Sequence, residues 1–441
     1  MSALINPRTL KGFRDSLPGS ELKKRTLIRK LEQVFKLFGF VPIDTPALEY
    51  SEVLLGKGGG ETDKQVYRFF DNGTRDVALR YDLTVPFARF VAAHISELYM
   101  PFKRYHIAKV WRGENTQRGR FREFTQCDFD IVGTDTLSSD FEILLIMARS
   151  MEALGIGEFR IHFSHRGIFN RLLRRLGLDE QTADILRTVD KLPKLGPEKT
   201  SEILRSFTGD REIESILKFI TPGQTFDETL ALVIQEAGGE SEDSHRLAGL
   251  KKLIDAMELD QIYVLDPSIT RGLDYYTGIV FETFLADQPE LGSICSGGRY
   301  NDLASLYTKK SIPGVGSSIG LDRICAALEK PGMAVNGRHE PILLIICMDE
   351  NFLGHYHKTA KFFRQAGVSV EVFAEKKKLA RQFQFAEKKG IPLALICGEA
   401  ERAKNTFIIK DLRSRDSYEN LTADQSLSKV RELVPISHPC E

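Results

Sequence analysis

The sequence predicts an α+β protein, in which an antiparallel sheet flanked by helices carries a helical insertion and is followed by a separate α/β domain. Three observations predict this fold class. A period-two pattern over residues 102–133 indicates a long β-hairpin, and residues 167–255 read as short, charge-rich helical segments. Beyond residue 341, apolar strand runs alternate with helical segments, which is typical of a small α/β domain.

The length of 441 residues is sufficient for two or three domains and a substantial core. A segment with the composition of a linker, PGMAVNGRHEP, precedes the C-terminal strand runs. We therefore expect the sheet domain at 1–166 and 256–330, the insertion at 167–255, the linker at 331–340 and the C-terminal domain at 341–441.

The composition is that of an ordinary globular protein, with 42% hydrophobic and 28% charged residues. Lys plus Arg equals Asp plus Glu at 61 each, so no global positive field attracts nucleic acid or membrane, and any RNA contact must use local basic patches. The six cysteines include no Cys-x-x-Cys pair, which argues against disulfides or a metal site and favours a cytoplasmic location. The N-terminus lacks the apolar core of a signal peptide, and no apolar run reaches the ~18 residues that a membrane helix needs.

The N-terminal elements come in a clear order. Apolar residues at helical spacing predict a helix over 21–38, which ends at Gly39. The next segment, FVPIDTPALEY, is interrupted by Pro42 and Pro46, so we expect an edge or interface strand. Residues 56–62, GKGGGET, do not have the spacing of a phosphate-binding Walker loop, and we interpret them as a mobile glycine loop.

The predicted hairpin has one polar face. Its first strand, 104–114, places Arg112 and Glu114 on one side. In its second strand the even-numbered residues share a face because side chains alternate along a strand. These even-numbered residues are Arg120, Arg122, Phe124, Gln126, Asp128 and Asp130, and the odd-numbered Phe121, Cys127, Phe129 and Ile131 line the core side.

A solvated outer face is the structural alternative for this polar surface, because burying such groups unpaired costs several kcal/mol. The residue types favour a ligand instead. Guanidinium groups match phosphate oxygens, and Glu114 with Phe124 could hold a purine by hydrogen bonding and stacking.

The second half of the sheet domain continues this alternation. We expect a helix over 139–154, a strand over 159–163, and further strands in IYVLDPSI and RGLDYYTGIVFETFL. The segment SGGRYNDL predicts a tight turn, and GVGSSIGLDR predicts a helix that begins near Ser318 and carries Arg323 early. In the C-terminal domain a basic patch comprises Lys376, Lys377, Lys378, Arg381, Lys388 and Lys389, for which solvation alone is the simpler explanation.

Together these segments resemble the class II aminoacyl-tRNA synthetases over nearly the whole chain, and specifically the histidyl family. GFVPIDTPALE resembles the first class II motif, the hairpin the second, and GVGSSIGLDR the third. RGLDYYTG, residues 271–278, is similar to the signature that separates the histidyl enzymes from other class II families. SGGRYNDL departs from the family pattern, which usually continues with Asp-Gly where this chain has Asn301 and Asp302.

The resemblance implies activation of L-histidine with ATP and transfer to the 3′ end of tRNA(His), with Mg²⁺ accompanying ATP and no metal bound by the protein itself. It implies that Arg112 and Arg271 are catalytic, act on the α-phosphate and touch histidine. A salt bridge of Arg271 to Asp274 is the structural alternative. For ATP binding it implies Arg112, Glu114, Arg120, Phe124 and Arg323.

For histidine it implies a polar pocket made of Asp82, Leu83, Thr84, Arg112, Gln126, Asp130, Arg271, Tyr275 and Tyr276. Asp82, Thr84 and Gln126 would surround the ammonium group, and Asp130 and Tyr276 would address the imidazole. Asp82 stands where many members have glutamate, and a structural pairing with Arg80 or Arg89 is the alternative.

The resemblance further implies that Gln117, Arg118 and Arg122 contact tRNA, that the C-terminal domain binds the anticodon, and that the protein is a homodimer. The nearest competing function is a catalytically silent class II paralogue that acts as a regulatory subunit in histidine biosynthesis. Such paralogues typically lack the C-terminal domain and the arginine signature. A class II synthetase for another amino acid and a scaffolding module are further alternatives.

Overall fold

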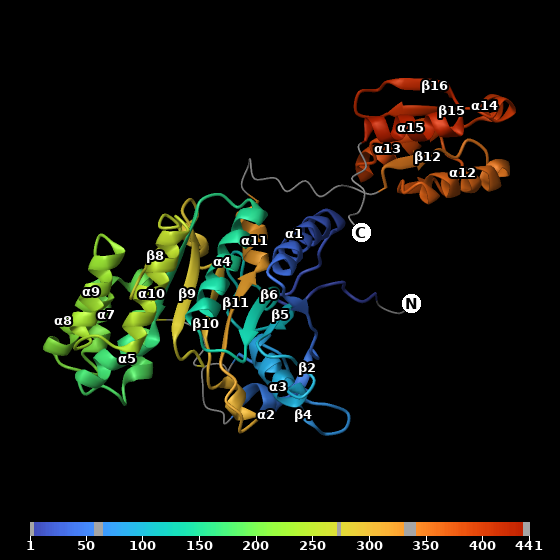
Figure 1. The fold of residues 1–441 in the computed structure, drawn as a ribbon. Coiled ribbons are helices and arrows are strands. Elements are labelled where there is room, and N and C mark those ends of the chain that lie inside the picture. Colours follow the sequence, from blue (N-terminus) through green and yellow to red (C-terminus); the bar gives the residue numbers. More distant parts are fainter. Residues whose placement is uncertain (1–3, 57–64, 271–274, 330–340, 435–441) are drawn as a thin grey trace. The chain divides into compact units, whose positions relative to one another are not determined.

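The computed structural model describes residues 4–56, 65–270, 275–329 and 341–434. The chain divides into two compact units, a larger one that contains residues 24–335 and a smaller one that contains residues 336–441 (Figure 1). Among the described residues, no helix has the length and apolar character needed to cross a membrane.

The larger unit is built on an eight-stranded sheet in the order β1-β5-β6-β11-β10-β9-β7-β8. Its central pairs are antiparallel, and the outermost pairs β1·β5 and β7·β8 are parallel. The strands are β1 (Val41–Pro42), β5 (Phe102–Trp111), β6 (Glu123–Val132), β7 (Phe159–His165), β8 (Tyr263–Leu265), β9 (Ile279–Leu285), β10 (Cys295–Arg299) and β11 (Gly314–Gly320). The predicted helix-flanked, mainly antiparallel sheet is confirmed, and β1 is an edge strand as expected.

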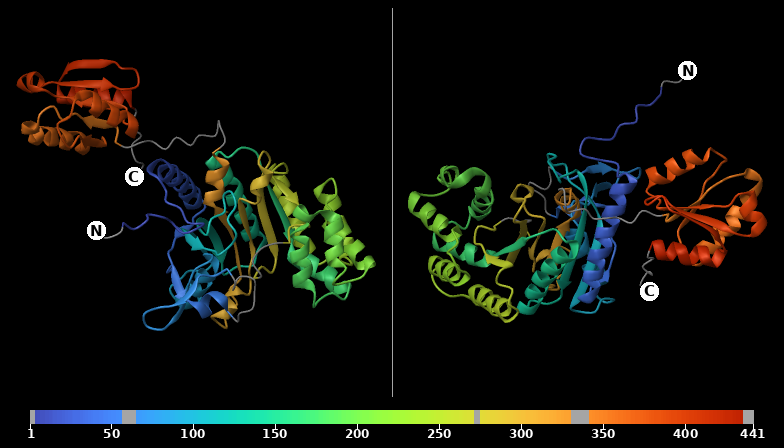
Figure 2. Two further views of the ribbon diagram at one scale, coloured as in Figure 1. Left: turned by 180° about the vertical axis from the view of Figure 1, so that it is seen from behind. Right: turned by 90° about the horizontal axis from the view of Figure 1, so that it is seen from above.

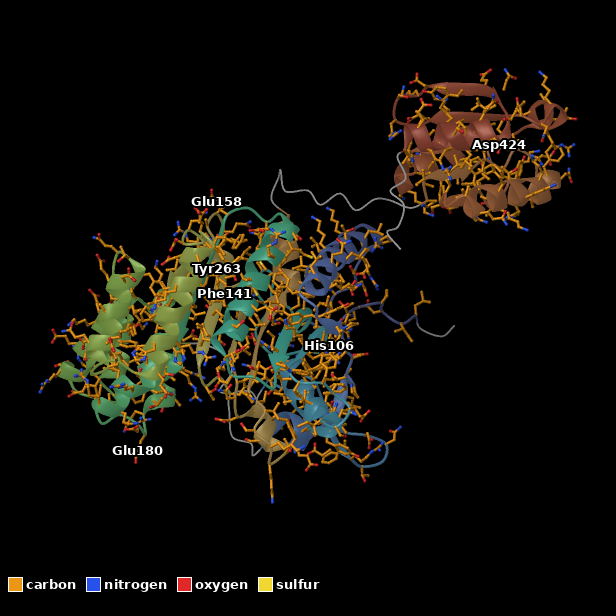
Figure 3. All side chains as sticks on the ribbon, in the orientation of Figure 1. His106, Phe141, Glu158, Glu180, Tyr263 and Asp424 are labelled. Carbon is orange, nitrogen blue, oxygen red and sulfur yellow. The ribbon has the colours of Figure 1, made fainter. Side chains whose placement is uncertain are left out.

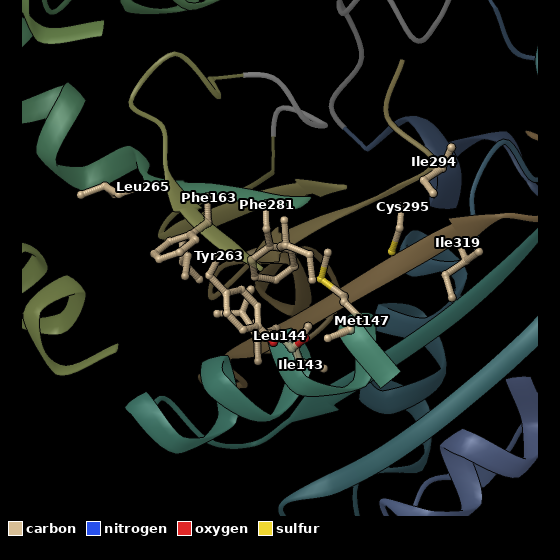
Figure 4. Packing of buried hydrophobic residues seen from close by; sticks show 14 of the residues in the cluster. Ile143, Leu144, Met147, Phe163, Tyr263, Leu265, Phe281, Ile294, Cys295 and Ile319 are labelled. Atoms are coloured by element: carbon tan, nitrogen blue, oxygen red, sulfur yellow. Dashed lines mark hydrogen bonds between the residues drawn. The ribbon is translucent and has the colours of Figure 1, made fainter. Parts of the chain in front are cut away.

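One face of this sheet packs on helices. Cys127, Phe129 and Ile131 of β6 join a core that includes Leu31 and Phe35 of α1 (Pro18–Leu37). Helix α4 (Leu137–Leu154) begins at Thr136, whose hydroxyl accepts from the backbone N–H of Ser139, and ends at a left-handed glycine, Gly155. Figure 4 shows Leu144 and Met147 of α4 close to Phe281 and Cys295 of the sheet. The predicted helices at 21–38 and 139–154 and the strand at 159–163 are confirmed within a few residues.

The other face carries the shorter elements. These are β2 (Leu48–Tyr50), α2 (Ser51–Leu55), β3 (Arg68–Phe70), β4 (Asp76–Leu79) and α3 (Thr84–His94), whereas α11 (Leu321–Ala327), which follows β11, joins the core of α1 and α4. Strands β2, β4 and β3 form a small antiparallel sheet. A second core under α3 includes Phe87, Phe102 and Tyr300.

Helices α5 to α10 form the insertion beside β8 and β9, at one end of the sheet in both Figure 1 and Figure 2. They are α5 (Arg166–Arg175), α6 (Thr182–Val189), α7 (Leu192–Leu204), α8 (Asp210–Ile220), α9 (Phe226–Glu236) and α10 (Glu242–Ala256). Their pronounced amphipathic spacing buries residues such as Leu172, Ile216 and Leu250 while the charged residues face outward.

The smaller unit has a five-stranded sheet in the order β13-β12-β14-β15-β16, parallel across its first three strands and antiparallel across the rest. Its elements are β12 (Leu343–Ile345), α12 (Leu353–Gln365), β13 (Val370–Val372), α13 (Leu379–Lys389), β14 (Leu393–Ile396), α14 (Glu399–Lys404), β15 (Phe407–Asp411), β16 (Ser417–Leu421) and α15 (Ala423–Leu433). The predicted α/β domain is confirmed.

Two local predictions are wrong, and the solvated alternative for the polar face of the hairpin fails. GVGSSIG is strand β11 and the helix begins at Leu321, because alternate residues of this segment pack between β6 and β10. SGGR belongs to strand β10, and the expected turn comes only after Arg299. The polar face of the hairpin is not solvated: Gln126, Asp128 and Asp130 are all buried. The expected glycine loop after Gly56 lies outside the described residues.

Candidate active site

The hairpin loop and the third motif meet at one cavity in the larger unit. Its predicted lining residues are Arg112, Glu114, Arg120, Phe124, Gln126 and Arg323. Strand β5 ends at Trp111 and strand β6 begins at Glu123, so Arg112, Glu114 and Arg120 project from the connection and not from the strands themselves. Residues more than 190 positions apart in the sequence therefore face a single space, as the resemblance requires.

The charged groups at this cavity already attract one another. Glu114 lies between two guanidinium groups, 3.9 Å from Arg112 and 3.8 Å from Arg120. The Arg112 guanidinium also lies 5.2 Å from the centre of the Phe124 ring. Arg323 sits in the first turn of α11 and donates to the carbonyl of Ser293 on the neighbouring loop. Carboxylate, aromatic ring and cations are thus arranged around a space that can receive a base and its phosphates.

Several lining residues were missed by the sequence reasoning. They are Gly119, Phe121, Ser293, Ile294, Ser296, Ser318, Gly320 and Asp322. Ser296 and Ser318 are cross-strand neighbours on β10 and β11, so a period-two reading of both segments would have found them. Asp322 is buried, accepts from the backbone N–H of Thr125 at 2.8 Å, and pairs with Arg14 of the N-terminal arm.

A second group of predicted residues lies at the start of α3. Asp82, Leu83 and Thr84 are all buried. Asp82 accepts from the hydroxyl of Tyr275 at 3.2 Å and from the backbone N–H of Val85 at 3.2 Å. Burial raises the pKa of Asp82 to about 6, against the opposing effect of Arg112.

The structural alternative for Asp82 fails, because its expected arginine partners are engaged elsewhere. Arg80 donates to the carbonyls of Thr45 and Lys109, and Arg89 pairs with Glu49 at 2.7 Å. Asp82 instead accepts from Tyr275, which belongs to the signature segment. A carboxyl held in this way suits a cationic ligand.

Arg112 connects the two groups. Its Nε donates to the carbonyl of Tyr81 at 2.8 Å, next to Asp82, while its guanidinium lines the cavity with Glu114. Gln126 lines the same cavity, and its amide donates to the Ser318 hydroxyl at 2.7 Å.

Asp130 lies deeper in the sheet, where it is 2% exposed. It forms a 2.8 Å ion pair with Arg104 and accepts from the hydroxyl of Tyr300 at 2.5 Å. A Cβ added at Gly316 would stand 1.9 Å from an Asp130 oxygen, so the carboxyl occupies space that only a glycine on β11 leaves open. Arg104 and Tyr300 are functional residues that the sequence reasoning missed.

The two predicted tyrosines form an edge-on pair with ring centres 4.9 Å apart. Burial raises the pKa of both phenols, so both remain hydrogen-bond donors. The carbonyl of Tyr276 accepts from Arg166 at 2.8 Å, which fixes the chain within the described part of the signature. Arg271 and Asp274 themselves lie outside the described residues.

The predicted tRNA contacts lie on the hairpin loop. Gln117 and Arg118 are exposed, and Arg118 reaches the carbonyl of Ala326 at 3.4 Å. Arg122 is half-buried and donates to the carbonyls of Glu114 and Lys11, so it is engaged in holding the N-terminal arm.

Comparison with known proteins agrees with this geometry. The sequence model of histidyl-tRNA synthetase matches residues 12–324, and that of an anticodon-binding domain matches residues 343–433. The chain belongs to the histidyl-tRNA synthetase family. It is 48% identical over 445 residues to the histidine–tRNA ligase of Treponema denticola, covering 98% of this chain and 99% of that protein.

Solved structures of the family are also similar. The histidyl-tRNA synthetase of Nostoc sp. PCC 7120 matches with a TM-score of 0.84 and 32% identity, covering 98% of this chain and all of that one. A Bacillus halodurans protein described as an ATP phosphoribosyltransferase regulatory subunit/histidyl-tRNA synthetase matches with a TM-score of 0.71 and 22% identity, covering 88% of this chain and 97% of that one. The latter likeness establishes the fold alone.

Proposed function

We propose that this chain is a histidine–tRNA ligase, which activates L-histidine with ATP to histidyl-adenylate and transfers the histidyl group to the 3′ end of tRNA(His). The observation that carries the proposal is the convergence of Arg112, Arg120 and Arg323 on one cavity that also contains Glu114 and Phe124. Membership of the family and the matched anticodon-binding domain support it.

In the first step, the histidine carboxylate attacks the α-phosphorus of ATP, and pyrophosphate leaves with the bonding electrons. The nucleophile is already an anion, so no protein base is needed, and catalysis depends on position and positive charge. Arg112 binds the α-phosphate and the attacking carboxylate, which would otherwise repel each other. By resemblance, Arg271 acts on the same phosphate.

Arg120 and Arg323 hold the γ-phosphate end of ATP, Glu114 accepts from the adenine amino group, and Phe124 stacks on the ring. Mg²⁺ enters with ATP as part of the substrate. Mg²⁺ in such a substrate is bound mainly by phosphate oxygens and water.

The amino acid occupies the deeper end of the site. Asp82, Thr84 and Gln126 receive its ammonium group, and Leu83 contributes backbone between the first two. Asp130 and Tyr276 face the imidazole, with Tyr275 beside it; a carboxylate has about four acceptor positions, so Asp130 can accept a further N–H besides its present partners. Apolar amino acids would leave these buried groups unpaired and are rejected.

In the second step, a terminal ribose hydroxyl of tRNA attacks the carbonyl carbon of the adenylate, and AMP leaves. Gln117 and Arg118, with Arg122 beneath them, contact the acceptor end. The anticodon binds the smaller unit, where Lys376, Lys377, Lys378 and Arg381 are exposed. The family and the unpaired cysteines of the described chain support a cytoplasmic location.

We also propose a homodimer. On the small sheet β2-β4-β3, large apolar side chains are exposed: Tyr50 is 50%, Leu48 40% and Phe70 72% accessible. Exposed apolar residues gathered in this way mark an interaction surface. A native mass measurement tests it, and a mass near 49.8 kDa at micromolar concentration would reject it.

Histidine-dependent exchange of pyrophosphate into ATP tests the main proposal. We expect exchange with histidine and none with other amino acids, followed by charging of tRNA(His) but not of other tRNAs. Folded protein that supports no exchange would instead favour the regulatory paralogue. Against that alternative stand the full-length identity to a histidine–tRNA ligase and the presence of the anticodon-binding domain.

A further inference from the structure

Asp128 is a buried carboxyl on the active-site face that has no role in the mechanism above. It lies on β6 midway between Gln126 and Asp130, and its side chain shares their face. In the register of the sheet, Asp128 stands opposite His106 of β5 and Ser318 of β11. Figure 3 shows the position of His106 within the larger unit.

Strand geometry places Asp128 in the path of the amino acid. At about 3.3 Å per residue, Gln126 and Asp130 are roughly 13 Å apart along the strand, which is longer than a histidine molecule. A histidine whose ammonium is near Gln126 and whose ring points toward Asp130 therefore lies over Asp128. On that placement, its imidazole would approach Asp128 at least as closely as Asp130.

The two carboxyl groups differ in their availability. One Asp130 oxygen accepts from the Tyr300 hydroxyl, and the other lies 2.8 Å from the Arg104 guanidinium in an ion pair that lacks hydrogen-bond geometry. Asp128 is 1% exposed, and its Oδ1 has no hydrogen-bond partner among the residues that the structure describes. A buried acceptor without a hydrogen-bond partner destabilises a protein by about 1–3 kcal/mol, and a hydrogen bond from a ligand N–H would offset this loss.

The groups around Asp128 define how it can bind. Ser318 gives it a hydrogen bond, Arg104 attracts it, and Asp130 and Asp82 repel it. Across the strand, His106 is neutral because burial and the nearby arginines lower its pKa to about 3. Burial raises the pKa of Asp128, so its carboxyl can accept from a ring N–H or, when protonated, donate to a bare ring nitrogen.

We propose that Asp128 determines specificity for histidine by binding the imidazole nitrogen that Asp130 does not bind. This inference rests on the proposed histidine activation and adds a residue to it. The imidazole ring is then bound between two carboxyl groups of one strand, and each of its nitrogens has a hydrogen-bond partner.

Asp128→Ala tests the contact. We expect the KM for histidine in pyrophosphate exchange to rise by about ten- to a hundredfold, because one charge-assisted hydrogen bond is lost, while the KM for ATP stays unchanged. Asp128→Asn, which keeps the shape but cannot ionise, should show a smaller rise and keeps the test open if the alanine variant does not fold. Glu123→Gln is the matched control, since it removes a carboxylate from the opposite face of the same strand.

Two competitive inhibitors separate a ring contact from general damage. 3-(Pyrrol-2-yl)alanine and 3-(pyrrol-3-yl)alanine each keep one of the two ring nitrogens of histidine. If Asp128 binds one nitrogen, Asp128→Ala weakens inhibition by the analogue that retains it and leaves the other analogue unaffected. Equal changes for both analogues, or an unchanged KM for histidine, would overturn the proposal. Exchange by the wild-type protein reports separately on the histidine activation itself.

Discussion

The two ends of the active-site face hold charge in different ways. At the proposed nucleotide end, the side chains of Arg112, Arg120 and Glu114 are 25–31% exposed, and Glu114 lies 3.9 Å from Arg112 and 3.8 Å from Arg120. At the amino-acid end, Arg104 and Asp130 are 0% and 3% exposed and lie 2.8 Å apart. Exposed pairs of this kind contribute little to stability and can exchange partners readily, whereas a buried pair is fixed and costly to break.

The difference suggests a division of work. At the proposed nucleotide end, partly exposed cations can turn toward phosphate when ATP arrives and form new pairs with it. The amino-acid end is already arranged before histidine binds, at the cost of buried carboxyl groups whose pKa values are raised. Substitutions at the two ends should therefore differ in what they change.

The largest effect is expected at the residue that stabilises the negative charge of the transition state. Arg271→Ala should lower adenylate formation by roughly a thousandfold while ATP binding stays within about tenfold, because only the charge that develops on the α-phosphate loses its partner. Single-turnover formation of adenylate and equilibrium binding of ATP measure the two quantities. Equal losses in both would show that Arg271 serves binding or folding.

At the amino-acid end, the comparison is tested by the pH dependence of the stability of the Asp82→Asn variant. The folded-state pKa of Asp82 is about 6, above the unfolded value near 3.9, so its contribution to stability is full below about pH 4 and is lost as the pH rises through 6. The free energy of unfolding of Asp82→Asn relative to wild type should therefore increase by about 2–3 kcal/mol between pH 4 and pH 7. Urea unfolding without ligand measures it.

The same substitution should weaken histidine binding, since the ammonium loses its carboxylate. For the wild type, the KM for histidine should rise as the pH falls through about 6, and this dependence should be reduced in Asp82→Asn, where only the titration of histidine itself remains. A pH-independent stability difference between the two proteins would contradict the assigned burial of an ionisable Asp82.

The sequence predicted the two ends unequally. Period-two spacing predicted the polar face of β6. The residue types around Arg112 and Phe124 predicted a site for phosphate and a nucleotide base, because these residues lie close together in the chain. Asp82 and Tyr275 could be joined only through the family resemblance, since their contact depends on how α3 packs against the sheet. Arg104 and Tyr300 were missed because a lone arginine on a strand and a tyrosine after a glycine pair carry no signal without the register.

The same reasoning failed on burial. The polar residues of β6 were expected to face solvent or a ligand, and nothing in their spacing indicated that Arg104 would neutralise Asp130 inside the protein. The composition of the glycine-rich segment GVGSSIG predicts the approach to a helix, but the segment forms strand β11. Its glycines leave the space that the side chains of Asp130 and Tyr300 occupy. A single sequence does not show which residues of neighbouring strands will be in contact, because this depends on the register of the sheet.

At the nucleotide end, Arg120→Ala should raise the KM for ATP by about tenfold and leave the KM for histidine unchanged, since a single charge-assisted pair with phosphate is removed. Raising the salt concentration should weaken ATP binding to the wild type more than to this variant, because an exposed pair is screened. Steady-state exchange at two salt concentrations measures both. A parallel rise in both KM values would show that the loop itself has moved and that the two ends are not independent.

The smallest effect is expected at the rim of the proposed nucleotide end, where Arg118 is exposed and donates to the Ala326 carbonyl at 3.4 Å. Arg118→Ala should lower transfer to tRNA several-fold and reduce the salt dependence of tRNA binding by about one unit of slope, because one phosphate contact is lost. Pyrophosphate exchange should not change. Arg149→Ala is the matched control, since Arg149 is an exposed arginine paired with Glu152 on α4. If exchange falls together with transfer, Arg118 positions α11 and Arg323, and the rim belongs to the catalytic site.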